Sequence, residues 1–238
     1  MTMLLSHPKK FIFLKTKKTA GTSTEVLFQR WCVPGSISEK TAEELHYSDE
    51  QISEVGIVGA RGSTSSNYTF FNHMPAVRII EHIGIDTWNY YFKFVNVRNP
   101  FTRAVSQFFW RRPWVSDRGA VLQLKQGAPA SETIPELPQL QLLFTQMLKE
   151  TKRPAVEKFL LTGHPLDYYI RHESLQADIE AVIKKLDLDL ADLAKLPRLK
   201  AGSWTQLYPD HRVLFNEESR ELVSKTYQDW ISAFDYKF

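Results

Sequence analysis

A cluster of lysine and hydroxyl side chains follows the first apolar segment of the chain. Residues 11–14 read Phe-Ile-Phe-Leu, a short apolar run that predicts a buried strand. Residues 15–23 read Lys-Thr-Lys-Lys-Thr-Ala-Gly-Thr-Ser and combine cations and hydroxyls with a single glycine. Ammonium and hydroxyl groups both donate hydrogen bonds to phosphate or sulfate oxygens. Residues 15–23 therefore predict a site for such an anion.

An amphipathic segment after this loop predicts the helix that would complete the site. Val26, Leu27 and Trp31 lie on one helical face, and one of the hydroxyl residues 22–24 can cap the helix. Gly21 can adopt positive φ or let a ligand approach the backbone. The first N–H groups of a helix, together with its dipole, attract anions. The lysines precede a single glycine, so the pattern does not support a Walker A loop.

A second strand–loop–helix pattern lies in the middle of the chain. Residues 90–98 are rich in β-branched and aromatic types and predict a central strand that ends at Arg98. Pro100 predicts the first position of the following helix, and Ser106 lies about two turns into it. Open α/β sheets bind ligands at the carboxyl ends of their strands. We therefore expect Lys18 and Arg98 to converge on one crevice.

A histidine lies between these two motifs. Pro75 and the apolar spacing of residues 76–83 predict a helix that ends at Gly84. His73 precedes this helix and therefore occupies a loop-to-helix junction. A second histidine, His82, is expected within the helix.

The order of the predicted elements indicates the fold class. Strands that alternate with helices predict an α/β fold, with a central parallel β-sheet and helices on both faces. Further elements are expected as helices over 137–149, 155–161, 175–186 and 217–234 and as a strand over 167–172. The length predicts one domain or at most two, and a single domain over residues 1–238 is expected. The stretch 113–138, rich in Pro, Gly and Ser, is interpreted as a substrate-side loop.

Composition restricts the class of protein and its partners. The apolar content of 43% and charged content of 24% are typical of a globular protein. The net charge is only +3 and long basic runs are absent, so nucleic acid is not an expected partner. The single cysteine, Cys32, excludes an intrachain disulfide or a cysteine-based metal cluster and is expected to be buried. No apolar run has the length of a transmembrane helix or of a signal core. This indicates a cytoplasmic protein or a trimmed catalytic domain, and a cytoplasmic location is expected.

The two motifs resemble those of sulfotransferases that use 3′-phosphoadenosine 5′-phosphosulfate. Residues 13–23 are similar to the 5′-phosphosulfate loop of the family, and residues 92–106 are similar to its 3′-phosphate motif. The similarity is to the group that contains heparan sulfate 2-O-sulfotransferase and short bacterial members. Segments 72–76, 167–175 and 227–236 are similar to family patterns in the same order. The resemblance implies a P-loop-NTPase-like sulfotransferase fold, adenosine 3′,5′-bisphosphate as product, and no metal.

The resemblance also implies roles for particular residues. Lys18 would contact the bridging oxygen of the phosphosulfate, Arg98 would hold the 3′-phosphate, and His73 would be the general base. The residues implied for binding the cofactor are Lys18, Thr19, Ala20, Gly21, Thr22, Ser23, Arg98, Ser106, Lys200 and Ser203. Lys17 stands where the family carries proline, and Lys18 is preferred as the working lysine because it directly precedes Thr19-Ala-Gly. Trp204 is a candidate for stacking on adenine.

The expected reaction is in-line transfer of a sulfuryl group to a hydroxyl of a carbohydrate or small metabolite. His73 would accept the hydroxyl proton, with a pKa near neutrality, and Lys18 would neutralise charge on the leaving oxygen. Lipid and peptide tyrosine acceptors stay open. The alternatives are a nucleotide-dependent kinase, for which we find no convincing set of Mg²⁺-binding acid and Walker lysine, and a non-catalytic nucleotide-binding protein.

Overall fold

The computed structural model describes residues 3–33, 48–62, 67–71, 73–115, 134–153, 157, 160, 163–189, 191 and 208–238. The chain forms two compact units, of which the first comprises residues 1–97 and 154–200 and the second comprises residues 98–153 and 201–238. The predicted single domain stays a prediction.

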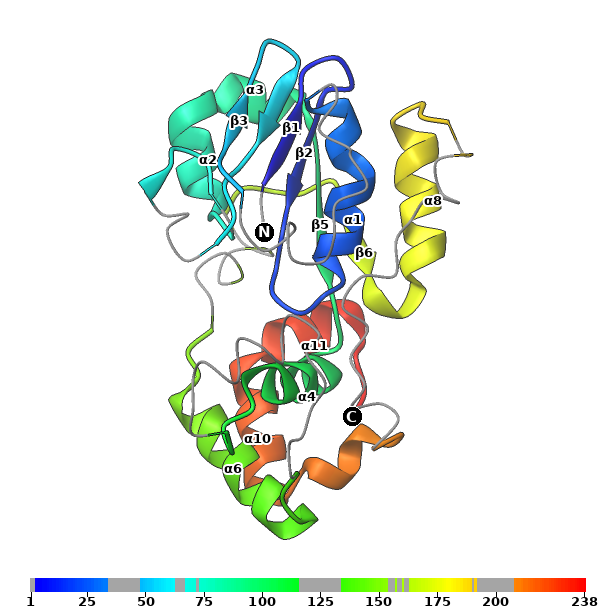
Figure 1. Ribbon diagram of the computed structural model, residues 1–238. Helices are drawn as coiled ribbons and strands as arrows, with labels where there is room; N and C mark the ends of the chain where they lie inside the picture. The colour runs from blue at the N-terminus through cyan, green and yellow to red at the C-terminus, as the bar shows by residue number, and fades with distance from the viewer. Residues whose placement is uncertain are drawn as a thin grey trace. The chain divides into compact units, whose positions relative to one another are not determined.

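The first unit contains a six-stranded sheet with the strand order β3-β4-β1-β2-β5-β6 (Figure 1). Its strands are β1 (Leu4–Ser6), β2 (Phe11–Leu14), β3 (Gln51–Ile52), β4 (Gly56–Val58), β5 (Phe92–Val97) and β6 (Tyr168–Arg171). Its helices are α1 (Gly21–Phe28), η1 (Gln29–Trp31), α2 (Ala76–Ile83), α3 (Ile85–Tyr90), η3 (His172–Ser174) and α8 (Leu175–Lys185). The α/β class predicted from the sequence is confirmed.

The sheet is mixed, whereas the sequence predicted a parallel one. β2 pairs with β5 and β5 with β6 in parallel, while β1 is antiparallel to both β2 and β4. Only residues 7–10 join β1 to β2, and so short a connection cannot make the crossover that a parallel pair requires. The parallel part nevertheless places the carboxyl ends of β2 and β5 at one edge of the sheet. The lysine-rich loop leaves from this edge.

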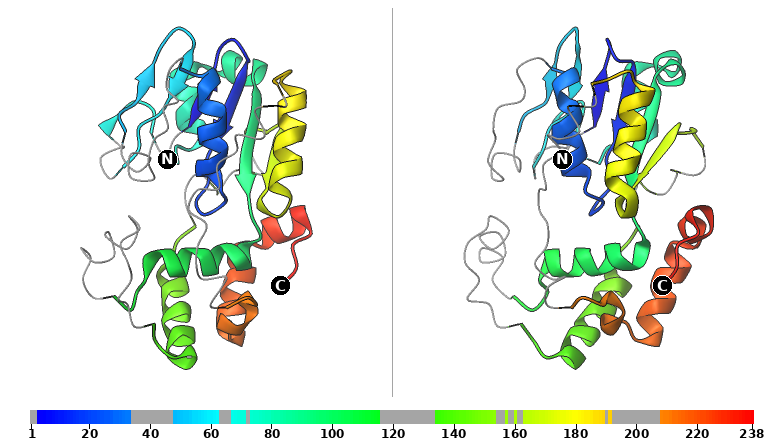
Figure 2. Two further views of the ribbon diagram at one scale, coloured as in Figure 1. Left: turned by 45° about the vertical axis from the view of Figure 1, so that its right-hand side comes forward. Right: turned by 90° about the vertical axis from the view of Figure 1, so that its right-hand side faces the viewer.

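Helices cover both faces of the sheet. Figures 1 and 2 show α1 and α8 on one face and α2 and α3 on the other. The first face buries Phe11 and Phe13 of β2 against Phe28 of α1 and Val182 of α8. Each large apolar side chain buried in this way contributes about 1.5–3 kcal/mol. Cys32, which follows η1, is fully buried as expected, and burial raises the pKa of its thiol.

The second unit is helical in the part of the chain that the structure describes. Its elements are α4 (Pro100–Arg111), α6 (Leu137–Glu150), η5 (His211–Leu214), α10 (Glu217–Thr226) and α11 (Gln228–Phe234). Its core includes Phe108 of α4, Phe144 of α6 and Leu214 of η5. The helix predicted over 217–234 is interrupted at Tyr227, where φ is −122° and ψ is 27°.

Several predicted segments lie wholly or largely outside the described residues. Of the substrate-side loop predicted over 113–138, residues 116–133 are not described, and Leu137 and Pro138 already belong to α6. Most of the helix predicted over 155–161 also lies outside the described residues. The helices predicted to begin at residues 76, 100, 137 and 175 are confirmed as α2, α4, α6 and α8.

Candidate functional site

The lysine-rich loop turns sharply before α1. Lys18 and Ala20 both adopt φ of 62°, and Ala20 is the N-cap residue with no side-chain hydrogen bond to the helix start. The prediction that one of residues 22–24 caps the helix is therefore wrong. Two of these hydroxyls have other partners, since Thr22 Oγ1 accepts from Lys15 Nζ and Thr24 Oγ1 accepts from Asn96 Nδ2.

The backbone of this helix start keeps the geometry of an anion site. The N–H groups of Ser23 and Thr24 donate to the carbonyl oxygen of Ala20, at 3.0 and 3.3 Å. For the N–H groups of Gly21 and Thr22, no acceptor is found in the described part of the chain. The first N–H groups of a helix ordinarily lack such partners and attract an anion together with the helix dipole. Gly21 and Thr22 therefore have the N–H groups that the predicted anion site requires, and the site itself stays a prediction.

Gly21 has a packing role that the sequence did not reveal. A Cβ atom on Gly21 would lie 2.7 Å from Lys15 Cγ and 2.9 Å from Lys15 Cε. The aliphatic part of Lys15 therefore passes directly over the first residue of α1. Positive φ falls on Lys18 and Ala20 instead, so Gly21 is needed here for close approach.

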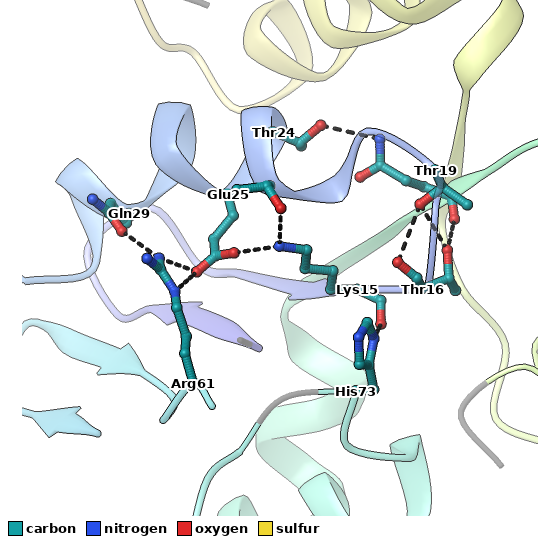
Figure 3. A network of polar contacts seen from close by, with 10 residues as sticks. Lys15, Thr16, Thr19, Thr24, Glu25, Gln29, Arg61 and His73 are labelled. Atoms are coloured by element: carbon teal, nitrogen blue, oxygen red, sulfur yellow. Dashed lines mark hydrogen bonds and ion pairs between the residues drawn. The ribbon is translucent and has the colours of Figure 1, made fainter. Parts of the chain in front are cut away.

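Lys15 belongs to a buried ionic network (Figure 3). Its Nζ lies 2.6 Å from Glu25 Oε2 and 2.9 Å from Thr22 Oγ1. The other carboxylate oxygen, Glu25 Oε1, accepts from Arg61 Nε at 2.7 Å, and Arg61 also donates to Gln29 Oε1 at 3.0 Å. The exposed fractions of Lys15, Glu25 and Arg61 are 2%, 0% and 4%. Burial alone would raise the pKa of Glu25, but the charges of Arg61 and Lys15 outweigh it and lower that pKa.

A second set of contacts joins the loop to β5. Thr16 Oγ1 donates to the carbonyl oxygen of Asn96 at 2.5 Å and lies 2.9 Å from Thr19 Oγ1. Asn96 Nδ2 donates to Thr24 Oγ1 at 3.0 Å. The end of β5 thereby holds both the loop and the first turn of α1. Sequence reasoning missed Asn96, although a polar side chain inside an apolar strand was a signal for it.

His73 lies against the same loop. Its Nδ1 is 2.9 Å from the carbonyl oxygen of Lys15. A carbonyl oxygen can only accept, so Nδ1 carries the proton and Nε2 of the neutral ring keeps its lone pair. Burial lowers the pKa of His73 to about 3. The hydrogen bond to the Lys15 carbonyl raises this pKa, whereas the charges of Lys15 and Lys17 lower it further. The imidazole is neutral at pH 7, but its pKa is far below the near-neutral value expected from the sequence.

The rival histidine and the flanking lysines occupy different environments. His82 lies within α2, as predicted, and its ring packs on Phe70 with centroids 5.5 Å apart. Lys17 is exposed and Lys18 is half-buried. The lysine that enters the core is Lys15, which sequence reasoning treated only as part of the loop. The structure therefore brings His73, Lys15 and the loop together.

Arg98 and Ser106 of the second predicted phosphate motif belong to the second unit. Arg98 is half-buried, and its Nε donates to Thr102 Oγ1 at 3.0 Å. Ser106 is buried one turn after Thr102, on the same face of α4. Asn99 caps this helix by accepting from the Phe101 N–H at 2.9 Å. Thr102 is a further polar residue of the motif, and its spacing of four residues from Ser106 was the signal for it.

Other predicted site residues cannot be placed. Lys200 and Ser203 lie outside the described residues, as do Gly202 and Trp204. The convergence of Lys18 and Arg98 would join the two units and stays a prediction.

The second unit also has a hollow of its own. Its volume is about 700 Å³, and its lining includes Phe101, Phe238, Arg220 and Lys225. None of the predicted site residues that the structure describes is among its lining residues. Arg220 stacks over the Phe238 ring, with its guanidinium carbon 4.6 Å from the ring centroid.

Comparison of the chain with protein-family models, with curated proteins and with solved structures finds no match. None of the described helices is long and apolar enough to cross a membrane. Among the described residues, no group of three or more His, Cys, Asp and Glu side chains is arranged to hold a metal ion. What the site can do chemically must therefore be argued from its own residues.

Proposed function

We propose that this chain is an O-sulfotransferase that uses 3′-phosphoadenosine 5′-phosphosulfate and acts on a hydroxyl of a carbohydrate or small metabolite. The observation that carries this proposal is the 2.9 Å hydrogen bond between His73 Nδ1 and the carbonyl oxygen of Lys15. This bond holds a neutral imidazole against a loop that has the features of an anion site. A base beside an anion-binding loop is what transfer from an anionic donor to a hydroxyl requires.

The residues present fit the phosphosulfate group. The N–H groups of Gly21 and Thr22, at the positive end of the α1 dipole, would bind the 5′-phosphate together with the Thr22 hydroxyl. Lys18 would contact the bridging oxygen. In the second unit, the guanidinium of Arg98 and the hydroxyl of Ser106 would bind the 3′-phosphate. The proposal includes a P-loop-like sulfotransferase fold, supported by the parallel part of the sheet and by the loop between β2 and α1.

The residues of the chain divide the chemistry between them. The bound donor supplies an electrophilic sulfur and a phosphate leaving group. His73 Nε2 takes the proton of the acceptor hydroxyl as that oxygen forms its bond to sulfur and the bond from sulfur to the phosphate oxygen breaks. Lys18 stabilises the negative charge that grows on this phosphate oxygen, an interaction that is strongest in the transition state.

The position of His73 suits this task better than its basicity in the free protein does. A pKa of about 3 keeps the ring unprotonated at pH 7, so every molecule has a lone pair on Nε2. An efficient base has a pKa nearer the working pH. The negative charges of a bound donor would oppose the effect of Lys15 and Lys17 and raise the pKa of His73. The base would then be strongest when the donor is present.

The proposal is tested by calorimetric titration with adenosine 3′,5′-bisphosphate beside AMP and ATP, with and without Mg²⁺. We expect a preference for the bisphosphate of about tenfold or more, equivalent to roughly 1.4 kcal/mol. Equal affinity for AMP would remove the support for a 3′-phosphate site. A Mg²⁺-dependent preference for ATP would favour the kinase alternative. Binding without transfer to any acceptor hydroxyl would favour a non-catalytic nucleotide-binding protein.

The expected cytoplasmic location is part of the proposal. Fractionation of the cells that express the protein would check it, and recovery of the chain with membranes or outside the cell would contradict it.

A further inference from the structure

Lys15 contacts two parts of the candidate site at once. Its carbonyl oxygen accepts the hydrogen bond from His73 Nδ1 at 2.9 Å. Its side chain runs in the opposite sense over Gly21, and its Nζ reaches Thr22 Oγ1 at 2.9 Å (Figure 3). Lys15 is only 2% exposed, so its ammonium group is not placed to meet a ligand directly. Any hydrogen-bonding effect of this group on a ligand therefore has to pass through a neighbour.

The contact with Thr22 fixes the direction of a hydroxyl proton. A lysine ammonium group only donates, so Thr22 Oγ1 must be the acceptor. The hydroxyl then keeps its own hydrogen for a different acceptor. Thr22 is the second residue of α1, where its own N–H and that of Gly21 lack acceptors in the described part of the chain. An anion bound at this helix start would be within the reach of the same side chain.

The rest of the network holds the ammonium group in place. Glu25 Oε2 lies 2.6 Å from Lys15 Nζ, and the other carboxylate oxygen of Glu25, Oε1, accepts a hydrogen bond from Arg61. Lys15, Glu25 and Arg61 together carry a charge of +1 in a buried setting, which favours an anion nearby. The Lys15 ammonium group is held between Glu25 and Thr22, so it loses little side-chain freedom when a ligand binds. Successive hydrogen bonds in such a network also strengthen one another.

We propose that Lys15 is a positioning residue, which holds the Thr22 hydroxyl as a hydrogen-bond donor to the 5′-phosphate of the bound nucleotide. This inference rests on the proposed function. It assigns two lysines of the loop different tasks, since Lys15 acts through Thr22 while Lys18 would contact the donor.

A double-mutant cycle of Lys15→Met, Thr22→Val and the double variant tests this role, with adenosine 3′,5′-bisphosphate as the titrated probe. A hydrogen bond to a charged group is worth about tenfold or more in affinity, so each single variant should bind about tenfold more weakly. The double variant should also bind only about tenfold more weakly, because both changes act through the same hydroxyl group. Independent contributions would multiply to about 100-fold and would overturn the proposal.

Matched controls separate positioning from folding. Thr22→Ser keeps the hydroxyl and should bind within about twofold of the wild type. Lys185→Met removes the same charge from an exposed position on α8 and should change nothing. Glu25 keeps Arg61 as its partner in Lys15→Met, so this variant should fold, and thermal unfolding checks that it does. Should Lys15→Met fail to fold, the pair Thr22→Val and Thr22→Ser still decides, because equal affinity in both would exclude a donating hydroxyl.

The outcomes for the two proposals are distinguishable. A wild-type protein that does not prefer the bisphosphate over AMP contradicts the proposed function. The same cycle titrated with inorganic phosphate then tests the positioning role alone. Bisphosphate preference in the wild type, with unchanged affinity in Thr22→Val, contradicts only the role of Lys15.

Discussion

The two candidate phosphate motifs of this chain are built in opposite ways. In the first, Lys15 and Glu25 are almost fully buried, and their contacts extend from the loop after β2 to Arg61, far along the chain. In the second, Arg98 is half-buried and bonds to Thr102, in the first turn of the helix that it precedes. Lys15 of the first motif is thus part of the core of its unit, whereas Arg98 of the second is only half-buried. The second motif also has a long-range contact, since Asn99 Nδ2 donates to the carbonyl oxygen of Lys237 at 2.7 Å.

This difference predicts how the two motifs respond to substitution. A buried charge that loses its partner remains desolvated and destabilises the fold, whereas a partly exposed cation can be solvated by water. Changes in the first motif should therefore alter both stability and ligand binding. A change of the half-buried Arg98 in the second motif should alter ligand binding alone.

The largest expected effect on stability is that of Glu25→Gln. This change leaves the buried cations Lys15 and Arg61 without their shared carboxylate, and removal of one partner from a buried ion pair typically costs about 3–5 kcal/mol. Denaturant unfolding of both proteins measures the difference. The matched control is Glu180→Gln, which breaks an exposed pair with Lys184 on α8 and should cost about 0.5 kcal/mol or less. Equal losses in the two variants would show that the network is not a stabilising part of the core.

The second expected effect is on turnover and follows from the proposed function. His73→Ala should lower kcat by about 100-fold or more, because a positioned general base contributes about that factor. Its affinity for adenosine 3′,5′-bisphosphate should stay within about threefold, since the imidazole acts on the acceptor hydroxyl. His82→Ala is the matched control, because His82 lies within α2 and its ring packs on Phe70. Wild-type turnover in His73→Ala would make the base assignment wrong.

The elements around both motifs could be predicted from the sequence because their signals are local. An apolar run predicted β2, and Pro100 after a β-rich stretch predicted the start of α4. The strands β1 and β4 have three residues each, too few for a periodic pattern to appear. Their antiparallel pairing is what makes the sheet mixed.

The interior of the first motif could not be predicted in the same way. Lys15, Lys17 and Lys18 are equivalent as a local pattern, and only the buried position of Glu25 and Arg61 determines which one enters the core. Lys15 and its partner Glu25 are 10 residues apart in the sequence, and Glu25 and its partner Arg61 are 36 residues apart. His73 was found through a family resemblance, and its tautomer became evident only from the contact with Lys15.

The third prediction concerns the second motif. Arg98→Ala should weaken binding of adenosine 3′,5′-bisphosphate by about tenfold and remove its preference over AMP, because a guanidinium grips phosphate through two hydrogen bonds. The free energy of unfolding should change by about 0.5 kcal/mol or less, since the side chain is half-buried. Arg111→Ala, at the exposed end of α4, is the matched control for loss of charge. A large loss of stability in Arg98→Ala would remove the contrast between the two motifs.

A further expected effect is a pH dependence of stability that originates in the first motif. The pKa of His73 is about 3 in the folded chain against an ordinary value of 6.5, so only the unfolded chain takes up this proton between those values. Stability should therefore fall as the pH drops below 6.5. The pKa of Glu25 is also lowered, below an ordinary value of 4.5, and its protonation in the unfolded chain adds a second loss of stability at lower pH.

Denaturant unfolding at pH 7.5, 5.5 and 4, chosen to lie about these values, should show a steady decline in the stability of the wild type. His73→Gln should reduce the decline between pH 7.5 and 5.5 without abolishing it, because burial also lowers the pKa of His211. A decline of the same size in that variant would place the titrating group elsewhere.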